Sequence, residues 1–355
     1  MISLKVNGRA YGGWKRASVT RSIEAASGVF SLEVSDRWTG QEVAWPINEE
    51  DECSLWLEDQ RVITGYVDKL DLSFGSEDHT IGVAGRDKVG TLIDCSAVLD
   101  QWEFKRLSVL KFAQKVAEPY GVSVTLQPFL VEPPPPAKIS IDPGDSALEA
   151  IERACRLAGL LPISDGAGGL VLVRAGDDHC VTALVEGENI LRGSASFDAS
   201  QRHRTYLVLG QHRGSDELNG EQAASIKGFA EDQNVRRTAR TLLIRPEGNV
   251  TPKQATDRAA WEASFRAAQG DTVTITVQGW TQATGVLWPV NSLVTVRSPS
   301  LRVSGDMLIT ETTFEVGESG TTTELTLRSP AAFSTEPVIT PAASSGLWKE
   351  IAGGV

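Results

Sequence analysis

A chain of 355 residues is too long for one ordinary domain, and its apolar fraction of 41% is enough to build stable cores. The 46 acidic residues outnumber the 34 basic ones and give a net charge of −12. This balance excludes a protein that binds DNA by neutralising its phosphates. An acidic surface can still lie beside passing DNA without holding it, because like charges repel.

The four cysteines, Cys53, Cys95, Cys155 and Cys180, stand far apart in the sequence. They form no CxxC or other metal-binding spacing, which predicts reduced, buried thiols. The N-terminus lacks the apolar core of a secretory signal, and no apolar run approaches the length that spans a membrane. These features predict a soluble protein that is made in a reducing compartment.

Residues 1–97 alternate between short apolar segments and turns. Apolar residues at Ile2, Leu4 and Val6 precede an Asn-Gly pair, which is typical of a β-hairpin turn. Acidic and Gly-containing turns separate the later apolar segments in the same way. The pattern predicts a first antiparallel β-barrel domain over this range.

A charged stretch, AGRDKVGTLIDCSAV, stands at the end of this predicted barrel. Cys95 within it has no histidine nearby in the sequence to act as a general base, so we interpret it as a small buried filler. We expect Arg86 or Lys88 to pair with Asp87 or Asp94 across a corner. The stretch is therefore predicted to close the first barrel and to lead through a short helical turn into the next domain.

The range 98–185 predicts a small α/β domain of two helix-then-strand units. The first helix falls within 108–126, and the second, within 145–163, begins with a capping box formed by Ser146 and Glu149. A Gly-rich turn then precedes a β-branched strand. The proline run VEPPPPAK between the two units predicts an extended excursion.

The rest of the chain returns to β-structure, and the hairpin layout of 308–330 echoes that of 67–87. This echo predicts a second copy of the first barrel. The expected order is second-barrel strands with a loop insertion at 186–250, a helix associated with the α/β domain at 251–270, the second β-barrel domain at 271–333 and an extended tail at 334–355. The overall fold class is thus α+β and mainly β, with two related antiparallel barrels.

No motif in the sequence predicts an active site, a cofactor site or a metal site. The four histidines, His79, His179, His203 and His212, have neither HExxH nor HxH spacing. A GxSxG nucleophile motif is absent, and the GAGG segment precedes a strand instead of the helix that a phosphate site requires. We therefore predict no catalytic residue, no cofactor and no metal ligand.

Tryptophan is unusually frequent, with nine residues. Trp38, Trp45, Trp280 and Trp288 fall at predicted strand ends or loops. Two interpretations stay open for them: they fill the interiors of the barrels, or they form contacts between subunits, where tryptophan is enriched.

Several segments resemble those of the Mu-like contractile-tail baseplate hub family. They are VTRSIEAASGVFSLEV (19–34), ITGYVDKL (63–70), VAGRDKVGTLIDCSAV (83–98), GENILRGSASFDASQRHRTYLVLGQ (187–211), VQGWTQATGVLWPVNSLVTV (277–296) and LITETTFEVGESGTTTELTLRSPAAF (308–333). They occur in the order expected for that family and extend over nearly the whole chain.

The resemblance implies a structural protein without catalytic activity. Such hubs have two related β-barrels with an α/β domain between and beside them, and they are related to the hub half of type VI secretion spikes. They form a homotrimer whose six barrels make a pseudo-sixfold ring. The ring joins the tail tube and other baseplate proteins to the central spike protein, and DNA passes through its channel without sequence-specific binding. The resemblance places the protein in the virion tail baseplate, assembled in the bacterial host cytoplasm.

Two other functions are weighed against this one. A tail-associated cell-wall hydrolase requires a histidine- or carboxylate-based site, and a monomeric carbohydrate-binding module uses exposed tryptophans. A peptidoglycan-release assay tests the first, and the mass of the protein in solution distinguishes the second from a trimer.

The tail at 334–355 extends beyond the expected end of the second barrel, and its short apolar patch is formed by Leu347, Trp348 and Ile351. This patch is too short to fold alone, so we predict that it docks onto a neighbouring tail protein. Deletion of 334–355 is expected to reduce incorporation of the chain into baseplates while leaving its thermal unfolding unchanged. Quantitative immunoblotting of purified particles measures incorporation, and an unchanged amount contradicts the prediction.

Overall fold

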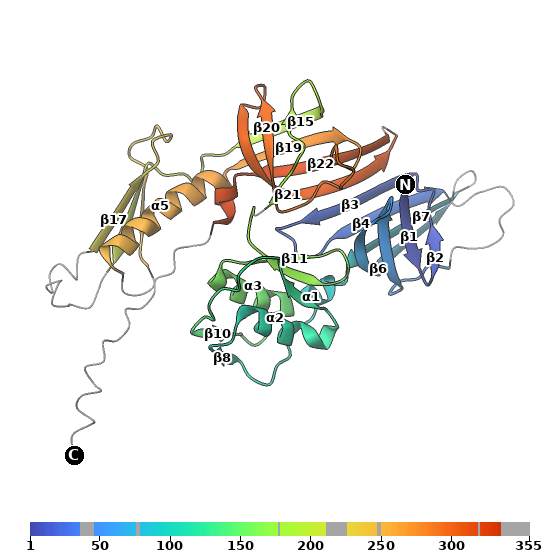
Figure 1. Cartoon of the computed structure of the whole chain (residues 1–355), viewed down its shortest axis with the longest axis horizontal. Helices are drawn as coiled ribbons and strands as arrows, with labels where there is room; N and C mark the ends of the chain where they lie inside the picture. Colours follow the sequence, from blue (N-terminus) through green and yellow to red (C-terminus); the bar gives the residue numbers. More distant parts are fainter. Residues whose placement is uncertain are drawn as a thin grey trace, which may run out of the picture. The chain divides into compact units, whose positions relative to one another are not determined.

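The structure is a computed structural model that describes residues 1–35, 46–75, 79–176, 178–210, 226–246, 250–318 and 320–334 (Figure 1). The chain divides into two compact units. Unit 1 contains residues 1–197 and 271–333, and unit 2 contains residues 198–270 together with the segment from Ser334 onward. The chain thus leaves unit 1 after residue 197, returns at residue 271 to complete it, and leaves it again after residue 333.

Unit 1 is built around one connected sheet, which confirms the mainly β fold class. Among the described residues the sheet has 14 strands, in the order β15-β19-β22-β21-β3-β4-β7-β6-β5-β1-β2, with β20 on β21 and with β13 and β14 on β20. Their bounds are β1 (Ile2–Val6), β2 (Arg9–Tyr11), β3 (Arg16–Ser22), β4 (Val29–Ser35), β5 (Glu52–Leu57), β6 (Gln60–Phe74), β7 (His79–Asp87), β13 (Asp178–His179), β14 (Leu184–Val185), β15 (Ile190–Phe197), β19 (Asp271–Gln278), β20 (Ser292–Ser298), β21 (Val303–Gly317) and β22 (Gly320–Arg328), and a 3-10 turn, η2 (Pro330–Phe333), follows.

The predicted first hairpin is confirmed in detail. β1 and β2 pair antiparallel around Asn7 and Gly8, whose positive φ angles of 49° and 76° are those of a tight hairpin turn. Ile2, Leu4 and Val6 are all buried, because alternate residues of a strand point to the same face. The alternation of the sequence therefore sets both the strand and the face that it buries.

The sheet contains the same arrangement of strands twice. An N-terminal module has the order β3-β4-β7-β6-β5, and a C-terminal module has the order β15-β19-β22-β21-β20, with every neighbouring pair antiparallel. In each module a strand of 15 residues is followed by one of 9 residues, and the ladder between them has one register shift. This repeat of order and length supports the duplication that the sequence echo predicts.

The two modules are joined by antiparallel pairing of β3 with the second half of β21 (Figure 1). Val19 lies opposite Phe314, and both side chains are buried. On the other face the hydroxyl oxygens of Thr20 and Thr313 are 3.0 Å apart. A single hydrophobic cluster includes buried residues from both modules. The two modules therefore share one core.

The expectation of two closed barrels is not met by the strand pairing: no closed barrel is found within the part of the chain that the structure describes. The reason is that β3, at the end of the N-terminal module, pairs with β21 on its second edge. That edge is not available to close a ring with β1 or β2.

The α/β domain packs three helices around a core of its own. Its elements are α1 (Gly90–Asp94), β8 (Glu103–Lys105), α2 (Val109–Ala117), η1 (Glu118–Tyr120), β9 (Val124–Leu126), β10 (Lys138–Ser140), α3 (Ala147–Ala158), β11 (Leu161–Ser164) and β12 (Leu170–Val173). The capping box of Ser146 and Glu149 is present, with each side chain accepting a backbone N–H of the other residue. The proline run lies in the loop between β9 and β10, as an excursion within the domain.

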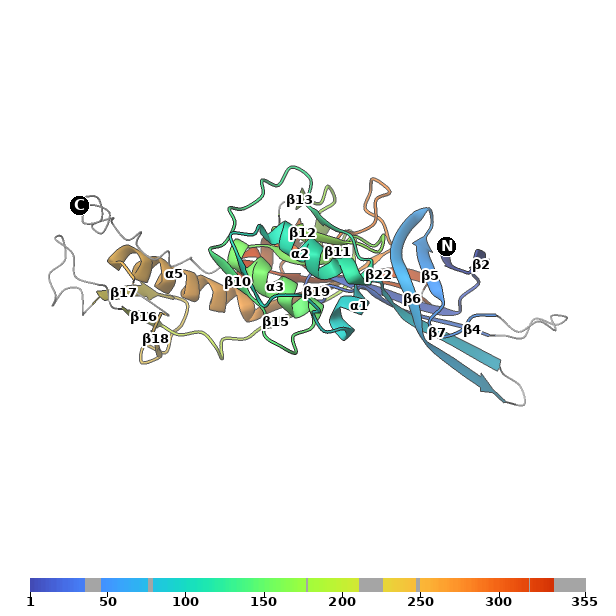
Figure 2. The same cartoon turned by 90° about the horizontal axis from the view of Figure 1, so that it is seen from below.

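Unit 2 is a small sheet covered by one helix (Figure 2). Its elements are β16 (Thr205–Gly210), β17 (Ile226–Glu231), β18 (Thr241–Ile244) and α5 (Pro252–Gln269). The helix begins with a second capping box, from Thr251 and Gln254. A Cβ atom at Gly228 would lie 2.1 Å from the carbonyl carbon of Ala255, so the close approach of α5 to β17 requires glycine there.

Two expectations for this region are corrected. The helix at 251–270 was expected to associate with the α/β domain, but its contacts are with β16 and β17. Of the strands expected at 186–250, only β15 belongs to the large sheet, and β16–β18 form a separate one. The physical reason is local: the apolar residues of α5 and β16 complete each other's core within unit 2.

Phe314→Ala tests the junction between the modules. The phenyl ring is 1% exposed, so its removal leaves a cavity and is expected to lower the free energy of unfolding by about 3–5 kcal/mol. Glu315→Ala, the exposed neighbour on the same strand, is the matched control and is expected to change it by less than about 0.5 kcal/mol. Urea denaturation followed by tryptophan fluorescence measures both, and equal effects would show that the junction does not stabilise unit 1.

Candidate functional site

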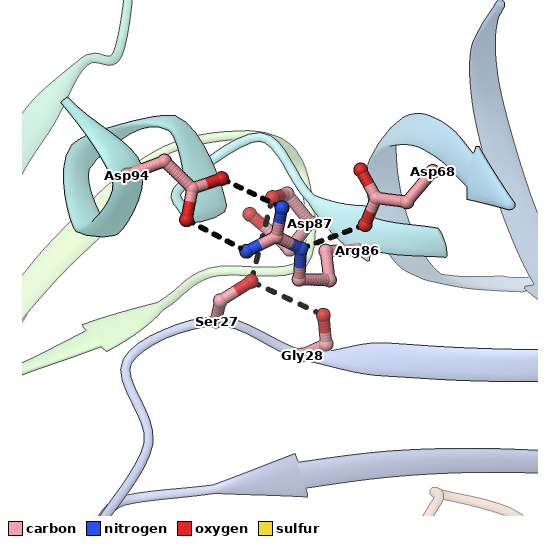
Figure 3. A network of polar contacts seen from close by, with 6 residues as sticks. All are labelled: Ser27, Gly28, Asp68, Arg86, Asp87 and Asp94. Carbon is pink, nitrogen blue, oxygen red and sulfur yellow. Dashed lines mark hydrogen bonds and ion pairs between the residues drawn. The ribbon is translucent and has the colours of Figure 1, made fainter. Parts of the chain in front are cut away.

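The charged stretch after β7 forms a corner of ion pairs (Figure 3). Arg86 Nε donates to Asp68 Oδ2 at 2.7 Å, and its Nη1 and Nη2 atoms donate to the two carboxylate oxygens of Asp94 at 3.1 and 2.6 Å. These bonds raise the pKa of Arg86 and lower the pKa of Asp94. The predicted pairing of Arg86 with Asp94 is confirmed, and β7 is tied to both β6 and α1.

Asp87 does not take part in that network as an ion pair and is buried instead, with 2% exposure. Its Oδ2 atom accepts a hydrogen bond from the Ser164 hydroxyl at 2.5 Å, and its Oδ1 atom accepts one from the Val89 backbone N–H at 2.9 Å. Burial raises the pKa of Asp87 to about 6, against the opposing effects of these hydrogen bonds and of the positive charge on Arg21. Of the two carboxylates considered for the corner, Asp94 forms the predicted pair, and Asp87 is a buried acid held by hydrogen bonds.

Asp87 and Ser164 link the N-terminal module to the α/β domain. Ser164 ends β11, and its carbonyl accepts a hydrogen bond from Arg21 of β3 at 3.0 Å while its backbone N–H donates to Ala26 at 3.0 Å. Ala26 lies in the loop between β3 and β4. The hydroxyl of Ser27, the next residue of that loop, donates to the carbonyls of Gly28 and Asp87 (Figure 3). β3, β7 and β11 thus meet at one buried polar cluster, whose partner groups satisfy one another.

A cavity of about 400 Å³ lies beside this corner, and its lining includes Tyr66, Arg86, Asp94, Cys95 and Tyr120. Cys95 is half-buried, which corrects the expectation of a buried filler. Two of the lining carboxylates, Asp68 and Asp94, bind Arg86, and the described lining contains no histidine that could activate the thiol. The arrangement holds segments together and provides no set of groups for nucleophilic chemistry.

The other cysteines have raised thiol pKa values. Burial raises the pKa of Cys53 and Cys155 to about 12 and that of Cys180 to about 11. All four cysteines are free, and the part of the chain that the structure describes contains no cluster of three His, Cys, Asp or Glu side chains suited to a metal ion. Buried thiols with such pKa values are inert at neutral pH.

The described histidines lie in separate parts of the chain. His179 is exposed and lies 3.4 Å from a carboxylate oxygen of Asp306, and its hydrogen bond to the Cys180 carbonyl raises its pKa. His203 contacts Tyr206 edge to face, and burial lowers its pKa. The backbone of His79 begins β7.

Two of the four tryptophans considered above belong to the core of unit 1. Trp280 and Trp288 are both buried, and the indole N–H of Trp280 donates to the Glu315 carbonyl at 3.1 Å. This outcome favours the interior interpretation for these two. Trp38, Trp45, His212 and the tail patch of Leu347, Trp348 and Ile351 lie outside the described residues.

Three family models match successive parts of the chain. Residues 1–87 match the N-terminal domain of Mu phage baseplate assembly protein GpP-like proteins, residues 89–174 match the second domain of baseplate hub protein gp44-like proteins, and residues 251–336 match the fourth domain of Mu phage baseplate assembly protein GpP. The chain is also 32% identical to baseplate hub protein gp44 of Escherichia phage Mu, over 88% of this chain and 83% of that protein. The chain belongs to the Mu-like baseplate hub family.

Solved structures agree with this assignment. The 43 kDa tail protein of prophage MuSo2 from Shewanella oneidensis is 29% identical, with a TM-score of 0.82 over 95% of this chain and 99% of that one. A type VI secretion system component of E. coli, described as structurally similar to bacteriophage T4 tail proteins gp27 and gp5, has the same fold at 8% identity, with a TM-score of 0.56 over 95% of this chain and 80% of that one. The family resemblance found in the sequence is thereby confirmed, and this hub family is one of structural tail proteins.

Sequence reasoning missed Ser164 and Arg21 as partners of Asp87. They lie 77 and 66 positions away in the chain, so no local spacing indicates that the three residues meet. The one local signal is the position of Asp87 two residues before Val89, the N-cap of α1, since an aspartate commonly accepts a backbone N–H two residues later. Among the described residues, no helix of this hub protein is both long and apolar enough to cross a membrane.

The pKa of Asp87 predicts a specific pH dependence of stability. Its value of about 6 in the folded chain is above the ordinary 3.8, so the folded state holds the proton more tightly. The free energy of unfolding is therefore expected to fall as the pH rises from about 4 through about 6, by up to about 3 kcal/mol from this group. Asp87→Asn removes this contribution, so the variant is expected to lose less stability than the wild type over the same range.

The comparison is made by urea denaturation at a series of pH values. Asp94→Asn is the matched control with the opposite sign, because Arg86 lowers the pKa of Asp94 and its contribution is lost as the pH falls. Identical pH profiles for wild type and Asp87→Asn would contradict the assignment of a buried, weakened acid at this position.

Proposed function

We propose that this protein is the hub of a contractile phage tail baseplate, a homotrimer that forms a pseudo-sixfold ring between the tail tube and the trimeric central spike. The observation that carries the proposal is the duplicated module in unit 1, joined head to tail through β3 and β21. Three chains with two modules each supply six related modules. A sixfold tube can then meet the ring above, and a threefold spike can meet it below.

Head-to-tail contacts support a ring in particular. A contact between two different surfaces leaves the complementary surfaces free at the two ends, so the same contact can be repeated until the assembly closes. In this chain the contact already occurs once, between the two modules. Membership of the baseplate hub family supports the same assembly.

The charge of the chain suits a channel for DNA. With 46 acidic and 34 basic residues, a surface of this protein repels the phosphate backbone and lets DNA pass without sequence-specific binding. The proposed partners are therefore further copies of the chain, the central spike protein, the tail tube and other baseplate proteins. The proposed location is the virion tail, after assembly in the host cytoplasm.

The mass of the full-length protein in solution tests the trimer. Light scattering is expected to give about 115 kDa, which is three copies of the 38.2 kDa chain, and electron-microscopy class averages are expected to show a threefold ring with a central opening. The measurement is repeated with the tube and spike proteins of the same phage added. A chain that stays monomeric in both samples overturns the trimer, and release of peptidoglycan fragments by the purified chain favours the hydrolase alternative.

A further inference from the structure

The proline run of the α/β domain, Pro133–Pro136, is extended in the folded chain. Residues 130–136, between β9 and β10, belong to no helix, strand or turn. A proline holds its own φ angle at about −65° and keeps the residue before it out of the helical region. Four consecutive prolines therefore favour the polyproline II conformation, whose backbone has no internal hydrogen bonds.

Exposure along the run follows the three-residue period of polyproline II. Pro133 and Pro136 are half-buried, whereas Pro134 and Pro135 between them are exposed. Val131, three residues before Pro134, is 82% exposed. One side of the run therefore faces the domain, and Val131 and Pro134 lie together on an outward side.

Both ends of the run are fixed to the α/β domain. Leu130 packs against the core of the domain, and the Arg106 backbone N–H donates to the Ala137 carbonyl at 3.4 Å. Between these two points, residues 131–136 form no hydrogen bond with the described part of the chain. Their carbonyl groups are therefore available as hydrogen-bond acceptors.

Phe129 precedes the run in a tight turn that favours glycine. The Leu130 backbone N–H donates to the Gln127 carbonyl at 3.2 Å, and Phe129, the third residue of this turn, has a φ angle of 65°. With Pro128 in second position, this is the pattern of a type II turn, which prefers glycine or asparagine in third position. A bulky side chain at that position strains the backbone.

The Phe129 ring does not stabilise the folded chain in return. Its residue is 104% exposed, so no described part of the chain packs on the ring. Together with Val131 and the outward prolines it forms an apolar surface on a loop. Apolar surfaces of this kind mark contact sites on proteins. A partner that encloses the ring accounts for both the strain and the exposure.

The conformation of the run indicates the chemistry of that partner. Polyproline II segments are bound by protein grooves that are lined with aromatic side chains. Proline rings lie against the aromatic faces, and indole or phenol groups donate hydrogen bonds to the free carbonyls. A phospholipid surface fits less well, because the exposed carboxylate of Glu132 lies within the apolar segment and is repelled by anionic head groups.

We propose that residues 129–135 dock into an aromatic-lined groove of a neighbouring protein of the tail. Val131 and Pro134 lie on the groove, and the Phe129 ring fills a pocket at its end. This contact rests on the proposed place of the chain in a baseplate, and it names the chemistry of one partner there. Because the segment is extended and fixed at both ends beforehand, its ordering costs little when the complex forms.

Photo-cross-linking in assembled particles tests the contact. The photoreactive amino acid p-benzoyl-phenylalanine replaces Phe129 in the full-length chain, and purified tail particles are irradiated and analysed by mass spectrometry of the cross-linked peptides. The expected product joins position 129 to one other tail protein, and alanine substitution of the aromatic residues nearest the cross-link in that protein removes it. The same probe at Val286, which is 53% exposed in a loop of unit 1, is the control and is expected to give no such product.

Pro134→Gly combined with Pro135→Gly tests the polyproline II conformation. Glycine removes the restriction on the backbone, so the yield of the cross-link from position 129 is expected to fall by roughly tenfold or more. Pro143→Gly, at an exposed proline of the same domain outside the run, is the matched control and is expected to leave the yield unchanged. An unchanged yield in the double variant overturns this mode of binding.

Phe129→Gly separates a docking role from a structural one. Glycine relieves the strained turn, so resistance to urea is expected to equal or exceed that of the wild type. Loss of the ring is expected to weaken binding to the cross-linked tail protein by roughly tenfold or more, as for a residue that anchors an interface. Val286→Ala removes an exposed apolar side chain elsewhere and is expected to change neither measurement. A less stable Phe129→Gly variant overturns the proposal, because the ring then serves the fold.

The remaining outcomes separate this contact from the proposed function. A cross-link from position 129 to a second copy of this chain, to phospholipid or to nothing overturns the docking segment and leaves the hub in place. A wild-type chain that is absent from purified tail particles overturns both.

Discussion

Antiparallel pairing of β3 with β21 is the contact on which the organisation of unit 1 depends. It joins strands that lie almost 300 residues apart, and it turns two similar modules into one sheet with one core. It also determines which edges remain. Because β3 uses its second edge within the chain, the equivalent edge of β15 and the matching half of β6 are left without a described partner.

The buried cluster of Arg21, Asp87 and Ser164 has a different role. It connects β3 and β7 of the N-terminal module to β11 of the α/β domain through hydrogen bonds with well-defined directions. A carboxyl group in such a place costs stability when it is ionised, as its raised pKa indicates. What it contributes is orientation, since the hydrogen bonds specify one arrangement of the three strands.

This hub thus combines apolar and polar contacts in separate places. The apolar ones, such as Val19 with Phe314, supply most of the burial and recur with the repeated module. The polar ones, such as Arg86 with Asp68 and Asp94, lie at the corner where the N-terminal module ends and the α/β domain begins. Insertions at such corners, and between β15 and β19 where unit 2 begins, change what surrounds the sheet without altering its strand order.

The sequence by itself determined the local elements. Alternation of Ile2, Leu4 and Val6 and the Asn-Gly pair specify a hairpin, and the Ser146–Glu149 spacing specifies a helix start, because these signals act over a few neighbouring residues. The order of segments along the chain also indicated the baseplate hub family, and the hairpin echo indicated the duplication. These features can be identified without knowing which distant segments of the chain are in contact.

Only the tertiary structure decided which distant segments meet. The pairing of β3 with β21, the burial of Asp87 beside Ser164 and the packing of α5 on β16 and β17 depend on the path of the whole chain. Each partner, read locally, is an ordinary amphipathic strand, a charged turn residue or an amphipathic helix, and such elements can pack on many surfaces. The choice among those surfaces is made by the shared core, so the sequence predicted the modules and the fold showed how they join.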